Sequence, residues 1–351
     1  MSKGKYDKVD PCLLSSPKEG LRVTMPVGVN CPLKCKHCYQ EGVARYSVDL
    51  GTNLNALAKM GESGVSKLYW DGAEPMTNRD IGLYLAVINH MKSKPGASPY
   101  LFERVSIATN GIFVNRERAE KLYAGGLRNI MVSLDGATPA THDYFRGLGS
   151  YEKAVRAIKI LKDVKFDVRI GTTVWKEITK ELEDIVKLGL EFGVNEIAFN
   201  WMQPIGEALN HQGLLVPNEH FQAVSEKVKA ISARHGTRIK ISFHRGGETN
   251  PDAACKGGVN IAYVSGEWVW PCSWISVVAP EFKSELSLKE HTLKEIIEND
   301  PTIQQFRETV DALGEDGACC PALCKVYNGA FKGPDPISAK GVHLANQKEL
   351  I

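Results

Sequence analysis

Short runs of β-forming residues alternate with helical patterns over residues 21–235 of this 351-residue chain. This regular alternation is typical of a parallel sheet, because two parallel strands must be joined by a long crossover, usually a helix. The pattern therefore predicts an α/β fold, and periodicity by itself allows either a six-stranded partial barrel or an open sheet. The expected strands are 21–29, 67–70, 104–109, 129–135, 166–174 and 195–202.

Two local signals refine this prediction. Pro26 lies within the first expected strand and indicates an edge strand, since proline cannot donate to a ladder on both sides. Thr52 is expected to be the N-cap of the helix that follows.

The character of the chain changes after about residue 236, where glycines, cysteines and the aromatic strand 266–270 appear. The segment 240–244 is assigned to this irregular part. Because this C-terminal part follows the sixth strand, we expect it to cap the barrel mouth on the side of that strand. The predicted domains are an N-terminal extension (1–20), a partial barrel (21–235) and a small cysteine-rich α+β domain (236–351).

Composition excludes several classes of protein. The formal net charge of +2 offers no basic excess for nucleic acid, and no stretch approaches the roughly 20 apolar residues that span a bilayer. The first residues contain no apolar signal segment, so a cytoplasmic location is expected. Nine cysteines in a reducing compartment indicate metal binding rather than a disulfide framework.

Three of the cysteines, Cys31, Cys35 and Cys38, directly follow the first expected strand. The carboxyl ends of the strands form the catalytic edge of a barrel or α/β sheet. Thiolates are soft ligands that suit iron–sulfur clusters or zinc. Three cysteines on a four-iron cluster leave one iron open to another ligand. Zinc would need a fourth ligand, and His37 lies awkwardly between two of the cysteines.

The spacing C-x3-C-x2-C followed by Tyr39 resembles the signature of the radical S-adenosylmethionine (SAM) superfamily. Three further segments agree in order and position: DGAEP (71–75), ATNG (108–111) and SLDG (133–136). Ala73 departs from the family pattern, which has glycine there, and its methyl group is tolerable if φ is negative.

This resemblance implies a partial (β/α)6 barrel that binds a [4Fe–4S] cluster through the three cysteines and SAM at the open iron. An electron from a reductase such as flavodoxin or ferredoxin would cleave SAM to a 5′-deoxyadenosyl radical. Asp135 and Arg146 could also belong to this predicted site, but they could equally be structural and hold the turn after the fourth strand. The implied SAM contacts are Gly72, Ala73 and Glu74 to the ammonium group, Tyr39 near the adenine, Ser133 to the ribose or carboxylate, and Thr109 and Asn110 in the pocket wall.

The later segment that ends in GEWVWPC resembles the hairpin that opens the SPASM and twitch domains of the same superfamily. The resemblance implies one auxiliary [4Fe–4S] cluster, and a structural zinc in the same thiolates is the alternative. The expected ligands are Cys255, Cys272, Cys320 and Cys324, with Cys319 able to replace Cys320.

Trp201, Met202 and Gln203 end the sixth expected strand, where they are candidates for contact with the substrate. The expected reaction is hydrogen-atom abstraction from a small biosynthetic molecule such as a sugar or aminocyclitol. This class is favoured because few residues precede the first strand, too few for a domain that recognises a leader peptide. The alternatives are a maturase of ribosomally made peptides and, more distantly, a non-catalytic zinc-binding interaction protein.

Overall fold

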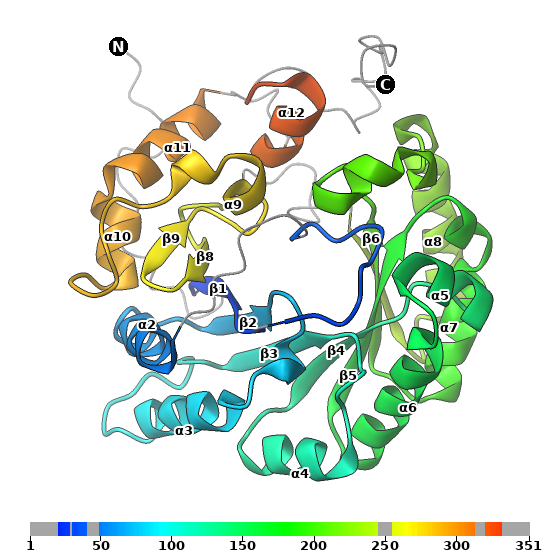
Figure 1. The fold of residues 1–351 in the computed structure, drawn as a ribbon, viewed down its shortest axis with the longest axis horizontal. Helices are drawn as coiled ribbons and strands as arrows, with labels where there is room; N and C mark the ends of the chain where they lie inside the picture. The colour runs from blue at the N-terminus through cyan, green and yellow to red at the C-terminus, as the bar shows by residue number, and fades with distance from the viewer. Residues whose placement is uncertain (1–19, 29, 41–48, 245–254, 313–319, 332–351) are drawn as a thin grey trace.

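The computed structural model describes residues 20–28, 30–40, 49–244, 255–312 and 320–331. Its strands form one sheet, in which β1 to β7 run parallel and lie in chain order. Figure 1 shows this sheet as an arc with helices along its outer side. The predicted partial barrel is confirmed. Its first six strands are β1 (Arg22–Pro26), β2 (Lys67–Asp71), β3 (Arg104–Thr109), β4 (Asn129–Ser133), β5 (Asp167–Val174) and β6 (Glu196–Trp201).

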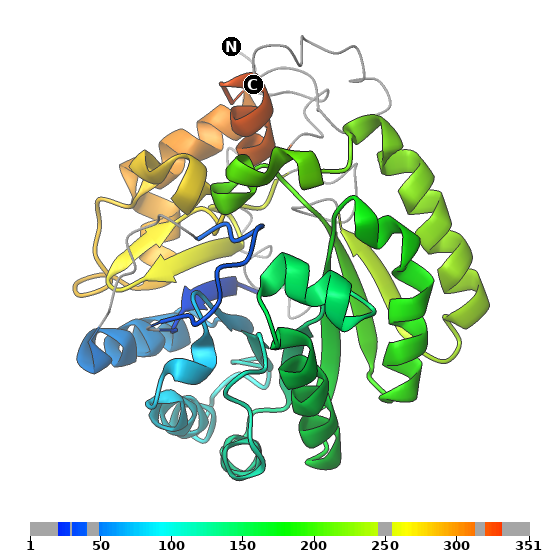
Figure 2. The same cartoon turned by 45° about the vertical axis from the view of Figure 1, so that its right-hand side comes forward.

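The helices of the barrel cover the outer face of the sheet and bury its apolar side chains (Figures 1 and 2). They have the periodicity of amphipathic helices, with apolar residues on the side that faces the strands. In chain order they are α2 (Leu50–Glu62), α3 (Ile81–Lys92), α4 (Arg116–Ala124), α5 (Pro139–Arg146), α6 (Ser150–Asp163), α7 (Leu182–Glu191) and α8 (Phe221–His235).

The helix α2 begins one turn earlier than predicted. Asp49 is its N-cap, and the Asp49 carboxylate accepts hydrogen bonds from the Thr52 amide at 3.0 Å and the Thr52 hydroxyl at 2.6 Å. The prediction that Thr52 caps this helix is therefore wrong. A carboxylate reaches the unpaired amides of a first turn as well as a hydroxyl does, and it also interacts favourably with the helix dipole.

The strand β1 is not an edge strand, contrary to prediction. On one side it pairs with β2, and on the other it pairs with β8 (Ile261–Ser265) along Arg22–Thr24. Pairing on the β8 side thus ends before Pro26, so the missing amide of Pro26 breaks no ladder bond. The strand β9 (Trp268–Trp270) runs antiparallel to β8 and completes the sheet.

The remainder of the C-terminal segment also differs from expectation. The strand β7 (Lys240–His244) pairs with β6 and extends the parallel sheet, while β8 joins its other end beside β1. We expected the C-terminal segment to cap the barrel mouth beside the sixth strand. For its strands this expectation is wrong, because β7 extends the sheet and β8 and β9 lie beside β1. None of the described helices is both long and apolar enough to cross a bilayer. The C-terminal helices are α9 (Ile275–Val278), α10 (Leu293–Asn299), α11 (Pro301–Asp311) and α12 (Pro321–Asn328).

Candidate active site

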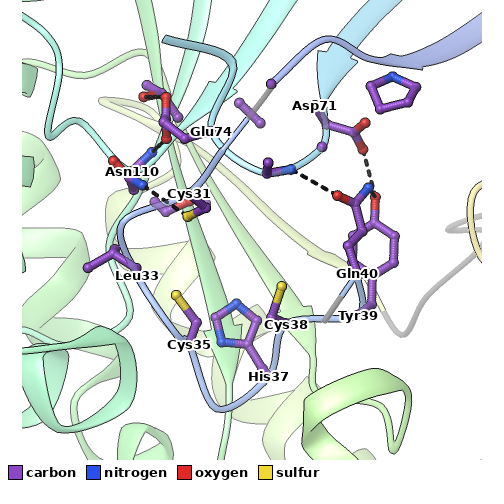
Figure 3. A pocket seen from close by; sticks show the side chains of 18 of the residues that line it. Cys31, Leu33, Cys35, His37, Cys38, Tyr39, Gln40, Asp71, Glu74 and Asn110 are labelled. Atoms are coloured by element: carbon purple, nitrogen blue, oxygen red, sulfur yellow. Dashed lines mark hydrogen bonds between the residues drawn. The ribbon is translucent and has the colours of Figure 1, made fainter. Parts of the chain in front are cut away.

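The three cysteines of the first group line one cavity of about 610 Å³ at the carboxyl ends of the strands. Figure 3 shows their sulfur atoms around a common space. Cys35 is buried, and Cys31 is half-buried. Backbone hydrogen bonds hold the loop in place, since the Lys36 amide donates to the Phe145 carbonyl at 3.1 Å. The structure thus brings together the residues that the spacing predicts as cluster ligands.

Gly206 supports this loop from the far side of the barrel. A Cβ atom at Gly206 would lie 2.5 Å from the Cys38 carbonyl oxygen, and the φ angle of Gly206 is +62°. Glycine alone meets both conditions easily. The next amide, that of Glu207, donates to the same carbonyl at 2.9 Å. No sequence motif indicated this contact.

The three thiols have the donor chemistry that an iron–sulfur cluster uses. Burial raises the pKa of Cys35 to about 11, although the Arg146 guanidinium acts in the opposite direction. A bound metal group would stabilise the thiolate form, and thiolates are the usual ligands of iron–sulfur clusters. Within the described ranges, no three His, Cys, Asp or Glu side chains lie close enough together to hold one ion.

His37, the candidate fourth ligand for zinc, is used for packing. Its ring stacks on Phe145 with a centroid distance of 4.6 Å, and its Nε2 atom lies 3.4 Å from Arg146 Nη2. Burial lowers the pKa of His37 to about 4, so the ring is neutral at physiological pH. The zinc alternative therefore gains no support from this residue.

Arg146 and Asp135 have both structural and cavity-facing contacts. Arg146 Nε donates to Asp135 Oδ2, and Nη1 lies 3.7 Å from Cys35 Sγ. Asp135 is fully buried and also accepts from the Thr173 amide, which ties the end of β4 to β5. Burial acts to raise the pKa of Asp135, but the charge of Arg146 and the hydrogen bond from the Thr173 amide, together with effects of the nearby histidines, outweigh it and leave the pKa below its ordinary value. The pair therefore places a cation beside a predicted cluster ligand.

The motif after β2 contains a strained residue. The φ angle of Ala73 is +47°, so the condition under which the sequence tolerated alanine, a negative φ, is not met. Its amide donates to Gln40 Oε1 at 2.9 Å. The left-handed conformation costs an L-residue about 1–2 kcal/mol, and this hydrogen bond helps to hold it.

Glu74 connects the second and third strands. Its carboxylate accepts from the Thr109 hydroxyl at 2.6 Å and the Asn110 amide at 2.7 Å, and also from the Met76 amide at 2.9 Å. Burial raises the pKa of Glu74, and these hydrogen bonds oppose the change. Glu74 thus organises the cavity wall. Its predicted contact with the SAM ammonium group stays a prediction.

Two residues of the cavity wall, Gln40 and Asp71, had no role assigned in the sequence analysis. The Tyr39 hydroxyl donates to Asp71 Oδ2 at 2.7 Å, and Gln40 Nε2 donates to the Tyr39 oxygen at 2.9 Å (Figure 3). Asp71 Oδ1 is buried and accepts no hydrogen bond in the part of the chain that the structure describes. Burial raises the pKa of Asp71 to about 6, with Tyr39 acting against it. Asp71 is the first residue of the DGAEP segment, so its place in that motif was the available signal, although no role was assigned to it.

The C-terminal segment forms part of the cavity wall. This wall contains the predicted SAM-binding residues of β2, β3 and β4 on one side and residues from β8, β9 and α9 on the other. The two parts of the chain therefore share one cavity. Its predicted lining residues are Tyr39, Gly72, Ala73, Glu74, Thr109, Asn110 and Ser133, and its C-terminal ones include Tyr263, Ser265, Trp270 and Ser276.

The predicted substrate residues lie elsewhere. Trp201 is buried against Phe221 and Phe243, with centroid distances of 5.1 and 6.1 Å. Gln203 is also buried, and its Oε1 accepts from the hydroxyl of Tyr327 in α12 at 3.2 Å. Neither residue is part of the cavity wall, to which β6 contributes Asn200. Their contact with substrate remains a prediction without support from the cavity.

The second cysteine group is partly assembled. Cys272 and Cys320 pack against one apolar cluster around Phe306, and burial, followed by the proximity of Cys320, raises the pKa of Cys272 to about 12. The chain after Cys255 lies beside Cys272, because the Gly258 amide donates to the Pro271 carbonyl at 3.2 Å.

The last two cysteines of this group have a different status. Cys324 lies one turn after Cys320 but is disulfide-bonded in the structure, so a ligand role for it requires reduction. Cys319 lies outside the described residues.

Comparisons with known proteins agree with this site. A sequence model described as the radical SAM superfamily matches residues 25–189. An AdoMet-dependent heme synthase of Methanosarcina barkeri is 29% identical over 315 residues, which cover 82% of this chain and 85% of that protein. The mycofactocin maturase MftC of Mycobacterium ulcerans is 25% identical over 343 residues, with coverage of 89% and 85%.

A solved structure shows the same fold. SuiB of Streptococcus suis, crystallised with S-adenosylmethionine, has a TM-score of 0.71 and 14% identity, with 93% of this chain and 79% of SuiB covered. SuiB has also been crystallised with its precursor peptide SuiA, and that structure has a TM-score of 0.68.

Proposed function

The chain belongs to the radical SAM superfamily, and we propose that it abstracts a hydrogen atom from a carbon of a ribosomally made peptide. The [4Fe–4S] cluster that this family uses with SAM would supply, once reduced, the electron that cleaves SAM to methionine and a 5′-deoxyadenosyl radical. The protein positions the reactants and keeps competing reactions out. Cys31, Cys35 and Cys38 would hold the cluster.

The observation that carries this proposal is the shared cavity. SAM-motif residues such as Glu74 and C-terminal residues such as Trp270 line the same space of about 610 Å³. A cavity of this volume holds roughly one drug-sized ligand, and SAM would occupy part of it. We infer that one side chain of a larger substrate enters the space that remains, while the rest of the substrate stays outside.

Charge supports a peptide over a tetrapyrrole. The carboxyl groups of Asp71 and Glu74 face the cavity, while the cation of Arg146 is already paired with Asp135. The Asp71 carboxylate accepts a hydrogen bond from Tyr39 and forms no ion pair among the described residues, so in its charged form it would repel the carboxylates of a tetrapyrrole and attract the amides or cations of a peptide. The peptide class is also supported by MftC and by the binding of SuiA to SuiB. We therefore prefer it to the small polar molecule expected from the sequence.

A tetrapyrrole remains the second candidate. It is favoured by the 29% identity to the heme synthase of M. barkeri over most of both chains. Such a substrate absorbs strongly in the visible region, so its binding can be followed directly in the cluster-free protein. A visible titration with a porphyrin carboxylate that reaches saturation would favour this candidate over the peptide.

We also propose that the second cysteine group holds an auxiliary [4Fe–4S] cluster. The thiols of Cys255, Cys272 and Cys320 come from segments that converge near Phe306, and α12 supplies Cys324. Such a cluster would accept one electron from the substrate radical that hydrogen-atom abstraction leaves, or it would anchor the substrate.

The central test is SAM cleavage. The anaerobically reconstituted protein, reduced with titanium(III) citrate, is expected to form 5′-deoxyadenosine, and Cys35→Ala is expected to abolish this. Cys12→Ala is the matched control, because Cys12 is outside both predicted ligand sets, although it lies beyond the described residues. Undiminished cleavage by Cys35→Ala would contradict the assignment. The peptide is tested by transfer of deuterium from a labelled candidate peptide into 5′-deoxyadenosine.

A further inference from the structure

The loop that carries the three cysteines has two chemically different sides. Every second residue from Cys31 to His37 lines the cavity, and the residues between them do not; the segment ends in a turn in which the Cys38 amide donates to the Cys35 carbonyl at 3.0 Å. Pro32 and Lys34 are exposed instead. One side of the loop therefore faces the SAM cavity and the other faces solvent.

The end of α5 continues this outer side. Lys36 Nζ lies 3.2 Å from the centroid of the Tyr144 ring, whose side chain is 55% exposed. Leu148 is 96% exposed and follows Gly147, which approaches Leu33 of the loop. Tyr144 and Leu148 are thus two large exposed side chains close in sequence at the end of α5, next to the two lysines of the loop. We call Pro32, Lys34, Lys36, Tyr144 and Leu148 the loop face.

The loop face carries positive charge close to the predicted cluster. Within the described ranges, neither Lys34 nor Lys36 forms an ion pair with a carboxylate. Asp143, which is also on α5, uses its carboxylate to accept from the amides of Gly149 and Tyr151 at the start of α6. Two lysines are thus available to a negatively charged partner.

We propose that the loop face is the docking site for a small acidic protein that carries a one-electron redox centre. This proposal rests on the proposed function, because only a redox group held by the cysteines needs such a partner. The inner side of the loop lines the cavity proposed for SAM, so the outer side is the one that a protein donor can approach. The carrier loses one electron and the group held by the cysteines gains it, with no bond formed or broken.

The physical properties of the loop face suit this partner. Electron-transfer encounters use small, transient interfaces, and charge complementarity acts mainly on their rate of association. Such a rate falls with ionic strength, because salt screens exposed charges beyond a Debye length of about 10 Å at 0.1 M. A rate that depends on salt with a protein donor, but not with a small donor, would be characteristic of docking.

The experiment compares two reductants. SAM cleavage is measured with limiting reduced flavodoxin, an acidic carrier, and with titanium(III) citrate, which needs no docking site. The variant is Lys34→Glu with Lys36→Glu. The control is Lys94→Glu with Lys165→Glu, which makes the same change of charge in exposed helix-to-strand loops at the other end of the barrel.

We expect the loop variant to lose roughly tenfold or more of the flavodoxin-driven rate at low salt, and to keep the titanium-driven rate. The control pair should keep both rates. An unchanged flavodoxin-driven rate, or an equal loss in the control pair, would overturn the proposal. If the unmodified protein does not cleave SAM with titanium(III) citrate, that result would instead contradict the proposed function.

A second variant and a second readout guard against damage to the cysteine loop. Leu148→Asp lies outside the loop and is expected to slow only the flavodoxin-driven reaction by severalfold. Independently of activity, carbodiimide should cross-link flavodoxin carboxylates to Lys34 or Lys36, as mapped by mass spectrometry. Cross-links confined to Lys94, Lys165 or other distant lysines would place the docking site elsewhere.

Discussion

The Nη1 atom of Arg146 lies 3.7 Å from the sulfur of Cys35, so a guanidinium directly contacts a predicted cluster ligand. The same guanidinium pairs through Nε with Asp135, which is fully buried. The potential of an iron–sulfur cluster depends on nearby charge and on hydrogen bonds to its sulfurs. Arg146 therefore stands where it can tune both the ligand and the cluster.

Removing this cation is expected to make the cluster harder to reduce. Replacing Arg146 alone would leave Asp135 buried without its partner, at a cost of about 3–5 kcal/mol. The appropriate variant is Asp135→Asn with Arg146→Gln, which removes both charges. We expect its cluster potential, measured by redox titration with paramagnetic resonance detection, to fall below that of Asp135→Asn alone. Equal potentials in the two variants would show that Arg146 has no electrostatic effect on the cluster.

Asp71→Asn is expected to stabilise the protein at high pH. Burial raises the pKa of Asp71 to about 6, above its unfolded value, so the folded state binds the proton more tightly. The free energy of unfolding therefore falls as the pH rises from about 4 to about 6. Asparagine does not ionise, so the free energy of unfolding of the variant does not fall in this way. At pH 8 it should exceed that of the unmodified protein by at most about 3 kcal/mol.

The measurement is thermal unfolding of the cluster-free protein at pH 4.5 and pH 8. The gain of Asp71→Asn should be small at pH 4.5 and larger at pH 8. Asp163→Asn, which removes an exposed carboxylate on α6, serves as the control. A gain of the same size at both pH values would mean that ionisation of Asp71 is not its cause.

Ala73→Gly should be close to neutral or stabilising, although alanine-to-glycine changes usually destabilise. Its φ of +47° is strained for alanine, and relief of about 1–2 kcal/mol offsets the greater entropy of unfolded glycine. Ala223→Gly is the control, because Ala223 is exposed within α8 and should lose about 0.5–1 kcal/mol. Thermal denaturation of both variants tests this difference. Equal destabilisation would argue against strain at Ala73.

Iron analysis should separate the two proposed clusters. The reconstituted protein is expected to contain about eight irons, and a variant with alanine at Cys31, Cys35 and Cys38 should retain about four. Replacing Cys272 by alanine should have the complementary effect and preserve SAM cleavage to 5′-deoxyadenosine. If the triple variant contains zinc without iron, the auxiliary site is a zinc site.

The hydrogen bond between Tyr327 and Gln203 gives a test of the role of Gln203. If this hydrogen bond is structural, it joins the segment after β6 to α12, which carries Cys324. Its loss in Tyr327→Phe should then lower the free energy of unfolding by about 1 kcal/mol and reduce the auxiliary iron content. Gln203→Ala should have the same two effects. A substrate contact would instead make Gln203→Ala impair product formation while Tyr327→Phe does not. Uncoupled SAM cleavage should survive in both variants, since neither residue lines the cavity.

The sequence by itself determined what depends on neighbouring residues. Cys31, Cys35 and Cys38 lie within eight positions, so their spacing alone makes them potential ligands of one group. The parallel sheet was also predictable, because each strand and helix has its own local period. The SAM motifs could be placed for the same reason, since each directly follows a strand that the pattern identifies.

Only the tertiary structure decided which distant segments meet. The pairing of β8 with β1, the contact of Arg146 with Cys35 and the hydrogen bond from Tyr327 to Gln203 join residues far apart in the chain. No local period encodes such contacts, because they form only when burial of the whole core offsets the entropy of closing long loops. For the same reason, the buried carboxylate of Asp71 and the outer face of the cysteine loop became visible only in the folded protein.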